Sequence, residues 1–155
     1  MISKAEEVPA LLNKFKHTTT GYVKFHEVDT FRVTHNLKYL EWTEVARVEY
    51  CRNIGISILP DMDNVQRSFS IFLVHSEVNY FAPATYFDKY IIYTRVCKLG
   101  KTSVTFEHII TKENGVPLCI NQAVEVYVGA DQHPIDVDEY IRRKIVDYEG
   151  DNIEF

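Results

Sequence analysis

The sequence lacks the patterns that mark a metal site, a disulfide framework or a nucleic-acid-binding protein. Its three cysteines, Cys51, Cys97 and Cys119, are widely spaced and form no C-x-x-C pair. We therefore expect no metal and no disulfide bond, only small buried thiols in a reducing compartment. The net charge is -5 and no basic run stands out, which argues against nucleic acid as a partner.

Long hydrophobic runs and common catalytic signatures are also missing. Residues 1–16 contain no apolar core typical of a signal peptide, and no apolar run is long enough to span a bilayer. We therefore expect a soluble cytoplasmic protein with no membrane partner. No G-x-S-x-G elbow, P-loop or H-E-x-x-H motif is present, and no cofactor is expected.

The chain does contain enough apolar sequence for one packed domain. Hydrophobic residues make up 46% of its 155 residues and aromatic residues 13%, which is sufficient for a core without staples. We divide it into an N-terminal arm (1–20), a single domain (21–148) and a polar tail (149–155).

A long helix is predicted over residues 36–54, and the other elements are organised around it. Its apolar side chains fall on one broad arc at 3.6 residues per turn. They are Leu37, Leu40, Val45, Val48, Cys51 and Ile54. His35 or Asn36 can begin the helix by accepting hydrogen bonds from free N–H groups. Gly55 can end it with a positive φ.

Most of the remaining chain has the composition of β-strands. A short strand is expected over residues 22–28 and a terminal helix over 136–148. Four long strands are expected at 68–81, 89–99, 102–112 and 116–128. Short connections, including the hairpin signal Glu113-Asn114-Gly115, predict an antiparallel meander. The fold class is therefore α+β, with a long antiparallel sheet wrapped around one central helix.

Three sequence blocks, taken in order, resemble the hotdog-fold acyl-CoA thioesterases, most closely the 4-hydroxybenzoyl-CoA thioesterase and YbgC-like group. The first block comprises Asp29, Asn36, Tyr39, Trp42 and the E-x-A-R of residues 44–47. The second is a Y-x-x-P-A-x-x-x-D strand break at residues 80–88, and the third is a hairpin at 99–106. The likeness covers residues 20–145. It implies a hotdog fold whose site lies between the subunits of a homodimer or homotetramer.

The resemblance implies a thioesterase that hydrolyses an acyl-CoA to the free acid and CoA. The backbone N–H at Asn36, at the positive end of the helix, would stabilise the oxyanion. Asp29 would act either as a nucleophile, through a mixed anhydride, or as a general base on water. Without the resemblance, Asp29 is more simply explained as an Asx-turn residue that follows a strand.

Three further candidates lie near these two residues. Arg32 stands where the family commonly has Gly, and it could narrow the pocket or meet a substrate carboxylate or phosphate. His35 could orient the substrate or transfer a proton, or it could simply start the helix. Tyr39 could form a wall of the acyl pocket, although a packing role is the simpler interpretation.

Four candidates come from later strands. His75 would lie near the pocket, or it would be a core or interface histidine. Lys98, Lys101 and Ser103 flank a turn at which the family tends to hold CoA phosphates, although they could equally form an ordinary solvated turn.

Two other functions remain open. The acyl donor could be an acyl carrier protein in lipid or polyketide biosynthesis, which is suggested by the atypical Arg32. The chain could also be a hotdog dehydratase, with His35 or His75 acting beside Glu41, or a non-catalytic acyl-binding protein.

Overall fold

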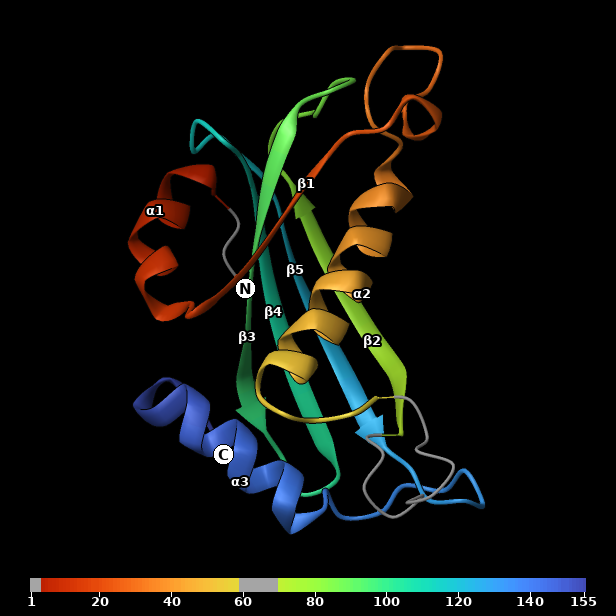
Figure 1. Cartoon of the computed structure of the whole chain (residues 1–155), viewed down its shortest axis with the longest axis vertical. Helices are drawn as coiled ribbons and strands as arrows, with labels where there is room; N and C mark the ends of the chain where they lie inside the picture. Colours follow the sequence, from red (N-terminus) through yellow and green to blue (C-terminus); the bar gives the residue numbers. More distant parts are fainter. Residues whose placement is uncertain (1–3, 59–69) are drawn as a thin grey trace.

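The computed structural model of the protein describes residues 4–58 and 70–155 (Figure 1). A five-stranded antiparallel sheet carries the fold, and its strands are ordered β1-β3-β4-β5-β2. The strands are β1 (His17–Tyr22), β2 (Ile71–Tyr80), β3 (Lys89–Leu99), β4 (Ser103–Lys112) and β5 (Pro117–Tyr127). One long helix, α2 (Asn36–Asn53), lies across one face of this sheet (Figure 1). The predicted α+β class is confirmed.

The two ends of α2 agree with the prediction. The Leu37 N–H donates a hydrogen bond to Nδ1 of His35, 3.3 Å away, so His35 is the N-cap. Gly55 has a φ of 79°, which is the left-handed conformation expected just beyond a helix end.

The predicted apolar arc of α2 is wrong in part. Leu37 and Val45 are 55% and 62% exposed, whereas Cys51 and Ile54 are buried. The buried face instead consists of aromatic and small side chains: Tyr39, Trp42, Thr43, Ala46, Tyr50 and Cys51. Aromatic residues with a polar group can be buried when that group has a partner. In α2 the Trp42 Nε1–H donates to Glu27, which meets this condition.

The predicted meander is confirmed for β3, β4 and β5 but is wrong for β2. β2 pairs with β5 at the far edge of the sheet and not with β3. Residues 81–88 must therefore cross the end of the sheet over about three strand spacings, roughly 14 Å. Eight residues span that distance easily.

The first strand begins earlier than predicted. β1 covers His17–Tyr22 and pairs with β3, whereas Phe25–Glu27 forms a short 3-10 turn. The expected strand at 22–28 is therefore wrong, and the boundary placed between residues 20 and 21 falls inside β1. The β-branched threonines at 18–20 suit this edge strand.

Two short helices complete the packing. α1 (Val8–Leu11) covers the sheet face opposite to α2, where Val8 packs with Ile109 and Ile120. α3 (Glu139–Glu149) packs on the same side as α2, with Ile141 and Ile145 in the cluster that contains Tyr50 and Phe106.

The C-terminal residues are part of the fold, so the expected polar tail is wrong. Ile153 is buried, and Glu154 forms a parallel bridge with Lys98 beside β3. The three cysteines are buried, as predicted, and each is a free thiol in the structure. Within the described residues, no helix has the length and apolar character needed to cross a membrane.

Candidate active site

A tight turn delivers Asp29 to the start of α2. Val28 and Thr34 form an antiparallel bridge, the Asp29 N–H donates to the Val33 carbonyl, and the Arg32 N–H donates to the Asp29 carbonyl, both at 2.9 Å. Arg32 closes the turn with a φ of 62°, in the left-handed region that favours Gly. Arg32 therefore closes a tight turn in a conformation that Gly adopts more readily.

The Asp29 side chain forms an Asx turn. Its Oδ1 accepts a hydrogen bond from the Phe31 N–H at 2.7 Å, and the residue is half-buried. The structural role that Asp29 could have without the resemblance is thus present. Within the described chain no group donates to Oδ2, which leaves this oxygen available to water or a ligand.

The first turn of α2 presents one free amide. The first N–H groups of any helix lack partners within the helix. His35 takes two of them, because its Nδ1 accepts from Leu37 and its carbonyl accepts from Lys38. No described residue accepts a hydrogen bond from the Asn36 N–H. This amide is therefore available to stabilise a negative oxygen.

A small open pocket of about 260 Å³ adjoins this helix start. It is lined by Thr34, Asn36, Tyr39, Tyr80, Phe81, Ala82 and Pro83. The Tyr80 hydroxyl donates to the Asn36 carbonyl, and the Ala84 N–H donates to the Tyr39 hydroxyl, both at 2.9 Å. Burial raises the pKa of Tyr39 and of Tyr80 above the ordinary tyrosine value. Both phenols are therefore neutral at neutral pH.

The turn and the pocket belong to one hydrogen-bonded unit. The Thr34 N–H donates to the Ala84 carbonyl at 2.8 Å, and Val33 forms a bridge with Thr85. The segment after β2 thus holds the Asp29 turn against the start of α2. The unit contains an amide donor at the start of α2, a carboxylate in the preceding turn and a mostly apolar pocket wall, and Asp29 is not among the residues that line this pocket.

Glu27 supports this unit, and sequence analysis missed it. The residue is buried, and its carboxylate accepts from Trp42 Nε1 at 2.9 Å and from the Lys24 N–H at 2.7 Å. Its carbonyl accepts from the His35 N–H at 2.9 Å. Because Glu27 lies in a stretch that resembled a strand, no pattern distinguished it. The sequence indicates Tyr80 only as the first residue of the strand-break motif.

The remaining predicted residues do not lie with Asp29 and Asn36 in this chain. His75 is exposed on β2, so it is not a core histidine. Lys98, Lys101 and Ser103 flank the β3–β4 turn, at the opposite end of the sheet from the start of α2 (Figure 1). Lys98 and Ser103 line a cavity of about 590 Å³ there, and Lys101 lies 3.7 Å from Asp136.

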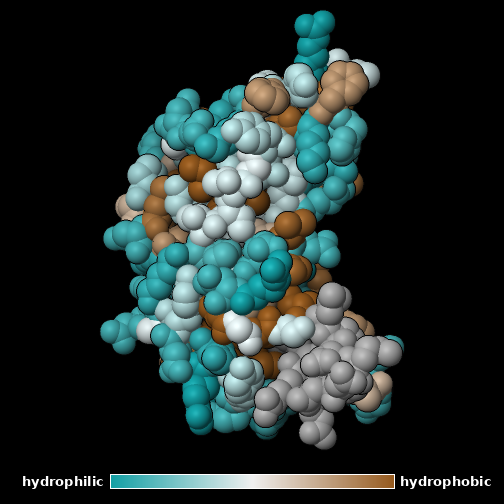
Figure 2. All heavy atoms as spheres, in the orientation of Figure 1, coloured by the Kyte–Doolittle hydropathy of each residue, from teal (hydrophilic) through white to brown (hydrophobic). Residues whose placement is uncertain are grey.

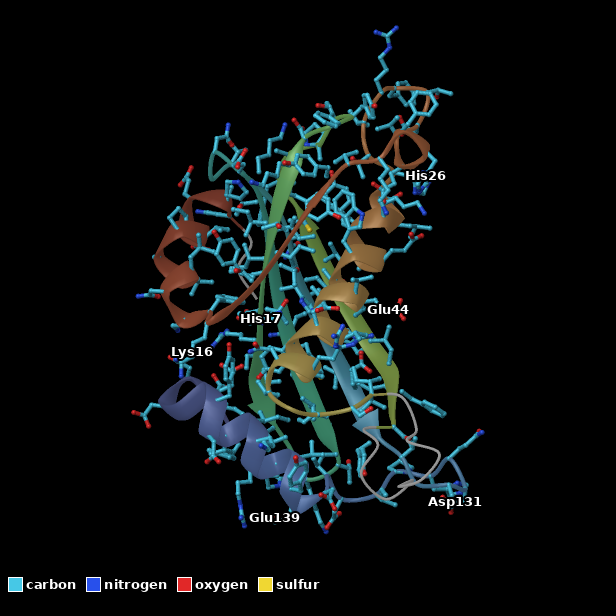
Figure 3. The ribbon with its side chains drawn as sticks, viewed as in Figure 1. Lys16, His17, His26, Glu44, Asp131 and Glu139 are labelled. Carbon is cyan, nitrogen blue, oxygen red and sulfur yellow. The ribbon has the colours of Figure 1, made fainter. Side chains whose placement is uncertain are left out.

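The buried polar groups under α2 hold the helix to the sheet. Arg47 forms an ion pair with Glu125 of β5. His108 is fully buried, and burial, with smaller effects from Arg47 and His17, lowers its pKa to about 3. Glu44 is exposed, and it lines a surface hollow together with Arg47 and Glu125; its position beside α2 is labelled in Figure 3. Within residues 4–58 and 70–155, no group of three or more potential metal ligands is found.

Comparisons with known proteins show which family the chain resembles. A family model described as the thioesterase-like superfamily matches residues 23–145. The chloroplastic acyl-acyl carrier protein thioesterase ATL3 of Arabidopsis thaliana is 25% identical over 134 residues, which cover 85% of this chain and 68% of that protein.

Solved structures show the same fold. A thioesterase from Thermus thermophilus, complexed with coenzyme A and Zn, is 26% identical, with a TM-score of 0.75 over 88% of this chain and 96% of that one. A 1,4-dihydroxy-2-naphthoyl-CoA thioesterase from Synechocystis is 16% identical, with a TM-score of 0.74 over 84% of this chain and 95% of that one, and it supports the fold alone. The hotdog arrangement predicted from the sequence is confirmed.

Proposed function

The chain belongs to the thioesterase-like superfamily and is a thioester hydrolase, and from this premise we propose that it hydrolyses acyl-CoA at the start of α2. The observation that carries this proposal is the free Asn36 N–H beside a pocket, at the helix start that follows the Asp29 turn. The products would be CoA and a free acid.

In the proposed reaction the thioester carbonyl oxygen accepts a hydrogen bond from the Asn36 N–H. The positive end of the helix dipole stabilises the negative charge that develops on this oxygen. Tyr80 supports the site through its hydrogen bond to the Asn36 carbonyl. The acyl group would pack against the wall formed by Phe81, Ala82 and Pro83.

Asp29 would supply the second half of the chemistry. Oδ1 is held by the Phe31 N–H, so Oδ2 is the oxygen that could attack the carbonyl carbon or take a proton from water. Direct attack would form a mixed anhydride and release the CoA thiolate, and water would then hydrolyse the anhydride. In the general-base route Asp29 would take a proton from water, the oxygen of that water would add to the carbonyl carbon, and the tetrahedral oxyanion would collapse to the acid and the CoA thiolate with no acyl group bound to the enzyme.

The proposal is tested by hydrolysis of a panel of acyl-CoA esters. We expect Asp29→Asn and Asp29→Ala to lose about 100-fold or more in kcat/KM. Asp131→Asn is the matched control, because Asp131 also accepts a local backbone hydrogen bond, from His133, but lies in an exposed loop at the other end of the molecule (Figure 3). Full activity in both Asp29 variants would remove this residue from the mechanism.

The acyl donor is the second question, since the Arabidopsis relative is named for acyl carrier protein and the Thermus structure contains CoA. Both donors share the pantetheine arm, so the same start of α2 could serve either. We favour CoA because the CoA-bound neighbour matches 96% of its own length. A kcat/KM at least tenfold higher for acyl carrier protein than for the same acyl-CoA would reverse this choice.

Geometry argues against the dehydratase alternative at two positions. A dehydratase would require a histidine beside a carboxylate at the reacting carbon. His35 instead caps the helix through Nδ1, and Lys38 pairs with Glu41. We therefore expect no loss of water from 3-hydroxyacyl thioesters.

A further inference from the structure

Five exposed aromatic side chains gather at the end of the molecule where α2 begins. We call them the aromatic platform: Tyr22, Phe25, Phe31, Tyr86 and Phe87. Three are phenylalanines, which are 78%, 84% and 68% exposed in that order. They come from the end of β1, from the segment between β1 and α2, and from the segment after β2, which lie together at the top of Figure 1. Moderately hydrophobic side chains are visible at the same end in Figure 2.

The platform is held as one unit by backbone hydrogen bonds. The Phe87 N–H donates to the Val23 carbonyl at 3.0 Å, and the Val23 N–H donates to the Asp88 carbonyl at 2.9 Å. The rings also meet across the two segments. Tyr22 stacks on Phe87 with centroids 5.4 Å apart, and Phe25 meets Tyr86 edge-on at 5.9 Å. Four of the five rings, all except Phe31, are therefore presented in a fixed arrangement.

The Phe87 ring is held outward by a strained backbone conformation. Phe87 has a φ of 67°, in the left-handed region that bulky residues rarely adopt. A strained residue that exposes a large apolar ring is a reason to look for a partner.

Charge identifies the chemistry of that partner. Lys24 precedes Phe25, and Arg32 follows Phe31; both basic residues are exposed. Of the acidic groups on these segments, Glu27 is buried, and Asp88 pairs with Lys112 at 2.7 Å. Asp29 is therefore the remaining half-exposed carboxylate. Exposed rings flanked by cations match the boundary between lipid headgroups and acyl chains.

We propose that the aromatic platform is a peripheral membrane-binding surface, which inserts its rings into the headgroup boundary of a bilayer that contains anionic phospholipid. Two protruding loop tips offer a small convex surface, whereas a stable protein interface buries about 800 Å² on each partner. A bilayer can deform around such tips. The contact needs no membrane-spanning segment, and it departs from the expectation of no membrane partner.

The inference bears on the proposed function, because the platform adjoins the start of α2. A site at the membrane surface would draw its substrate from acyl chains that partition into the bilayer. Vesicle binding is measured without any substrate, so the failure of this inference and the failure of the hydrolase proposal can be told apart.

The test is co-sedimentation of the full chain with vesicles of phosphatidylcholine containing 30% phosphatidylglycerol (about a third anionic lipid, chosen to give a negative surface). We expect binding by the wild type and a loss of about tenfold or more in the partition coefficient for the double variant Phe25→Ser, Phe87→Ser. Phe155→Ser is the matched control, since Phe155 is 76% exposed but lies outside the platform. Thermal unfolding of each variant verifies its folding.

Further measurements distinguish a bilayer from a protein partner and from a second copy of the chain. Lys24→Glu and vesicles of pure phosphatidylcholine should each weaken binding severalfold. Equal vesicle binding by wild type and double variant would overturn the inference. No vesicle binding, combined with binding of an acidic acyl carrier protein that the double variant loses, would identify a protein-docking surface and overturn it as well. So would a change from dimer to monomer in the double variant, because the rings would then contact a second copy.

Discussion

Arg32 adopts a backbone conformation that ordinarily belongs to glycine, and this makes its replacement informative. We expect Arg32→Gly to raise the free energy of unfolding by about 0.5 kcal/mol, because relief of roughly 1 kcal/mol of strain is partly offset by the greater freedom of Gly in the unfolded chain. Urea unfolding measures the change. Arg143→Gly, on the exposed face of α3, should instead lose about 1 kcal/mol. Equal losses in both variants would show that residue 32 carries no strain.

His108 should make the stability of the protein fall in mild acid. Its pKa is lowered to about 3 in the folded state from an ordinary 6.5. Between these values the unfolded chain binds a proton that the folded chain does not, so stability is full above pH 6.5 and declines as the pH falls. At 1.36 kcal/mol per pH unit, we expect a loss of about 2 kcal/mol from pH 7 to pH 5.

Unfolding in urea at several pH values tests this expectation. His108→Gln should remove most of the decline, whereas His133→Gln should keep it, because His133 is exposed. The Nδ1 of His108 lies 3.0 Å from the Thr94 hydroxyl, so glutamine can keep a polar contact there. An unchanged pH dependence in His108→Gln would assign the effect to another buried group.

At the scale of elements, α2 offers two adjacent positions with opposite surroundings. Ala46 is fully buried against the sheet, and Val45 beside it is 62% exposed. Ala46→Leu should cost about 1–3 kcal/mol by overpacking, while Val45→Leu should change stability by less than about 0.5 kcal/mol. Thermal or urea unfolding of the two variants gives the comparison. The reverse order would mean that the arc predicted from the sequence is the buried one.

The helix was predictable in its position but not in its orientation. Its ends depend on local groups such as His35 and Gly55, which the sequence displays directly. Its buried face depends on Tyr39, Trp42 and Tyr50, whose polar atoms find partners on segments distant in the chain, such as Glu27 and Glu149. A prediction that places only apolar residues on the buried face therefore selects Leu37 and Val45, which the structure leaves exposed.

The candidate site likewise has one part that the sequence predicts and one part that it does not. Asp29, His35 and Asn36 lie within one short stretch, and the resemblance was enough to group them. The pairing of β2 with β5 could not be inferred from short connections, yet it brings Tyr80 beside α2. The same topology sends the β3–β4 turn, with Lys98, to the other end of the sheet. Long-range pairing, and not local propensity, decides which candidates meet.

At the scale of the whole molecule, β2 is an open sheet edge. Phe72, Leu73 and Val74 are 47%, 56% and 60% exposed along it. An edge of this kind favours pairing with a second copy, and we expect a homodimer or homotetramer. Sedimentation velocity should give at least twice the 18.1 kDa chain mass. Such a partner could bring its own β3–β4 turn toward the start of α2.

Substitutions that introduce one charged residue test whether this edge binds a second copy of the chain. Val74→Glu should shift the protein toward monomer, whereas Val116→Glu, on an exposed hairpin turn, should not. A wild type that sediments only as monomer would count against a site shared between subunits. Dissociation by both variants would point to a general loss of folding, which circular dichroism would reveal.

The other edge of the sheet has a consequence for biosynthesis. β1 covers the upper part of β3. The lower part is covered on that side by the C-terminal segment, where Glu154 bridges Lys98, the Leu99 N–H donates to the Glu154 carbonyl and the Glu154 N–H donates to the Cys97 carbonyl. On the ribosome, that stretch of β3 stays uncovered until residue 154 has left the exit tunnel. The newborn chain therefore carries an unpaired strand edge from the emergence of β3 until the Glu154 segment emerges, and chaperones can bind that edge during this interval.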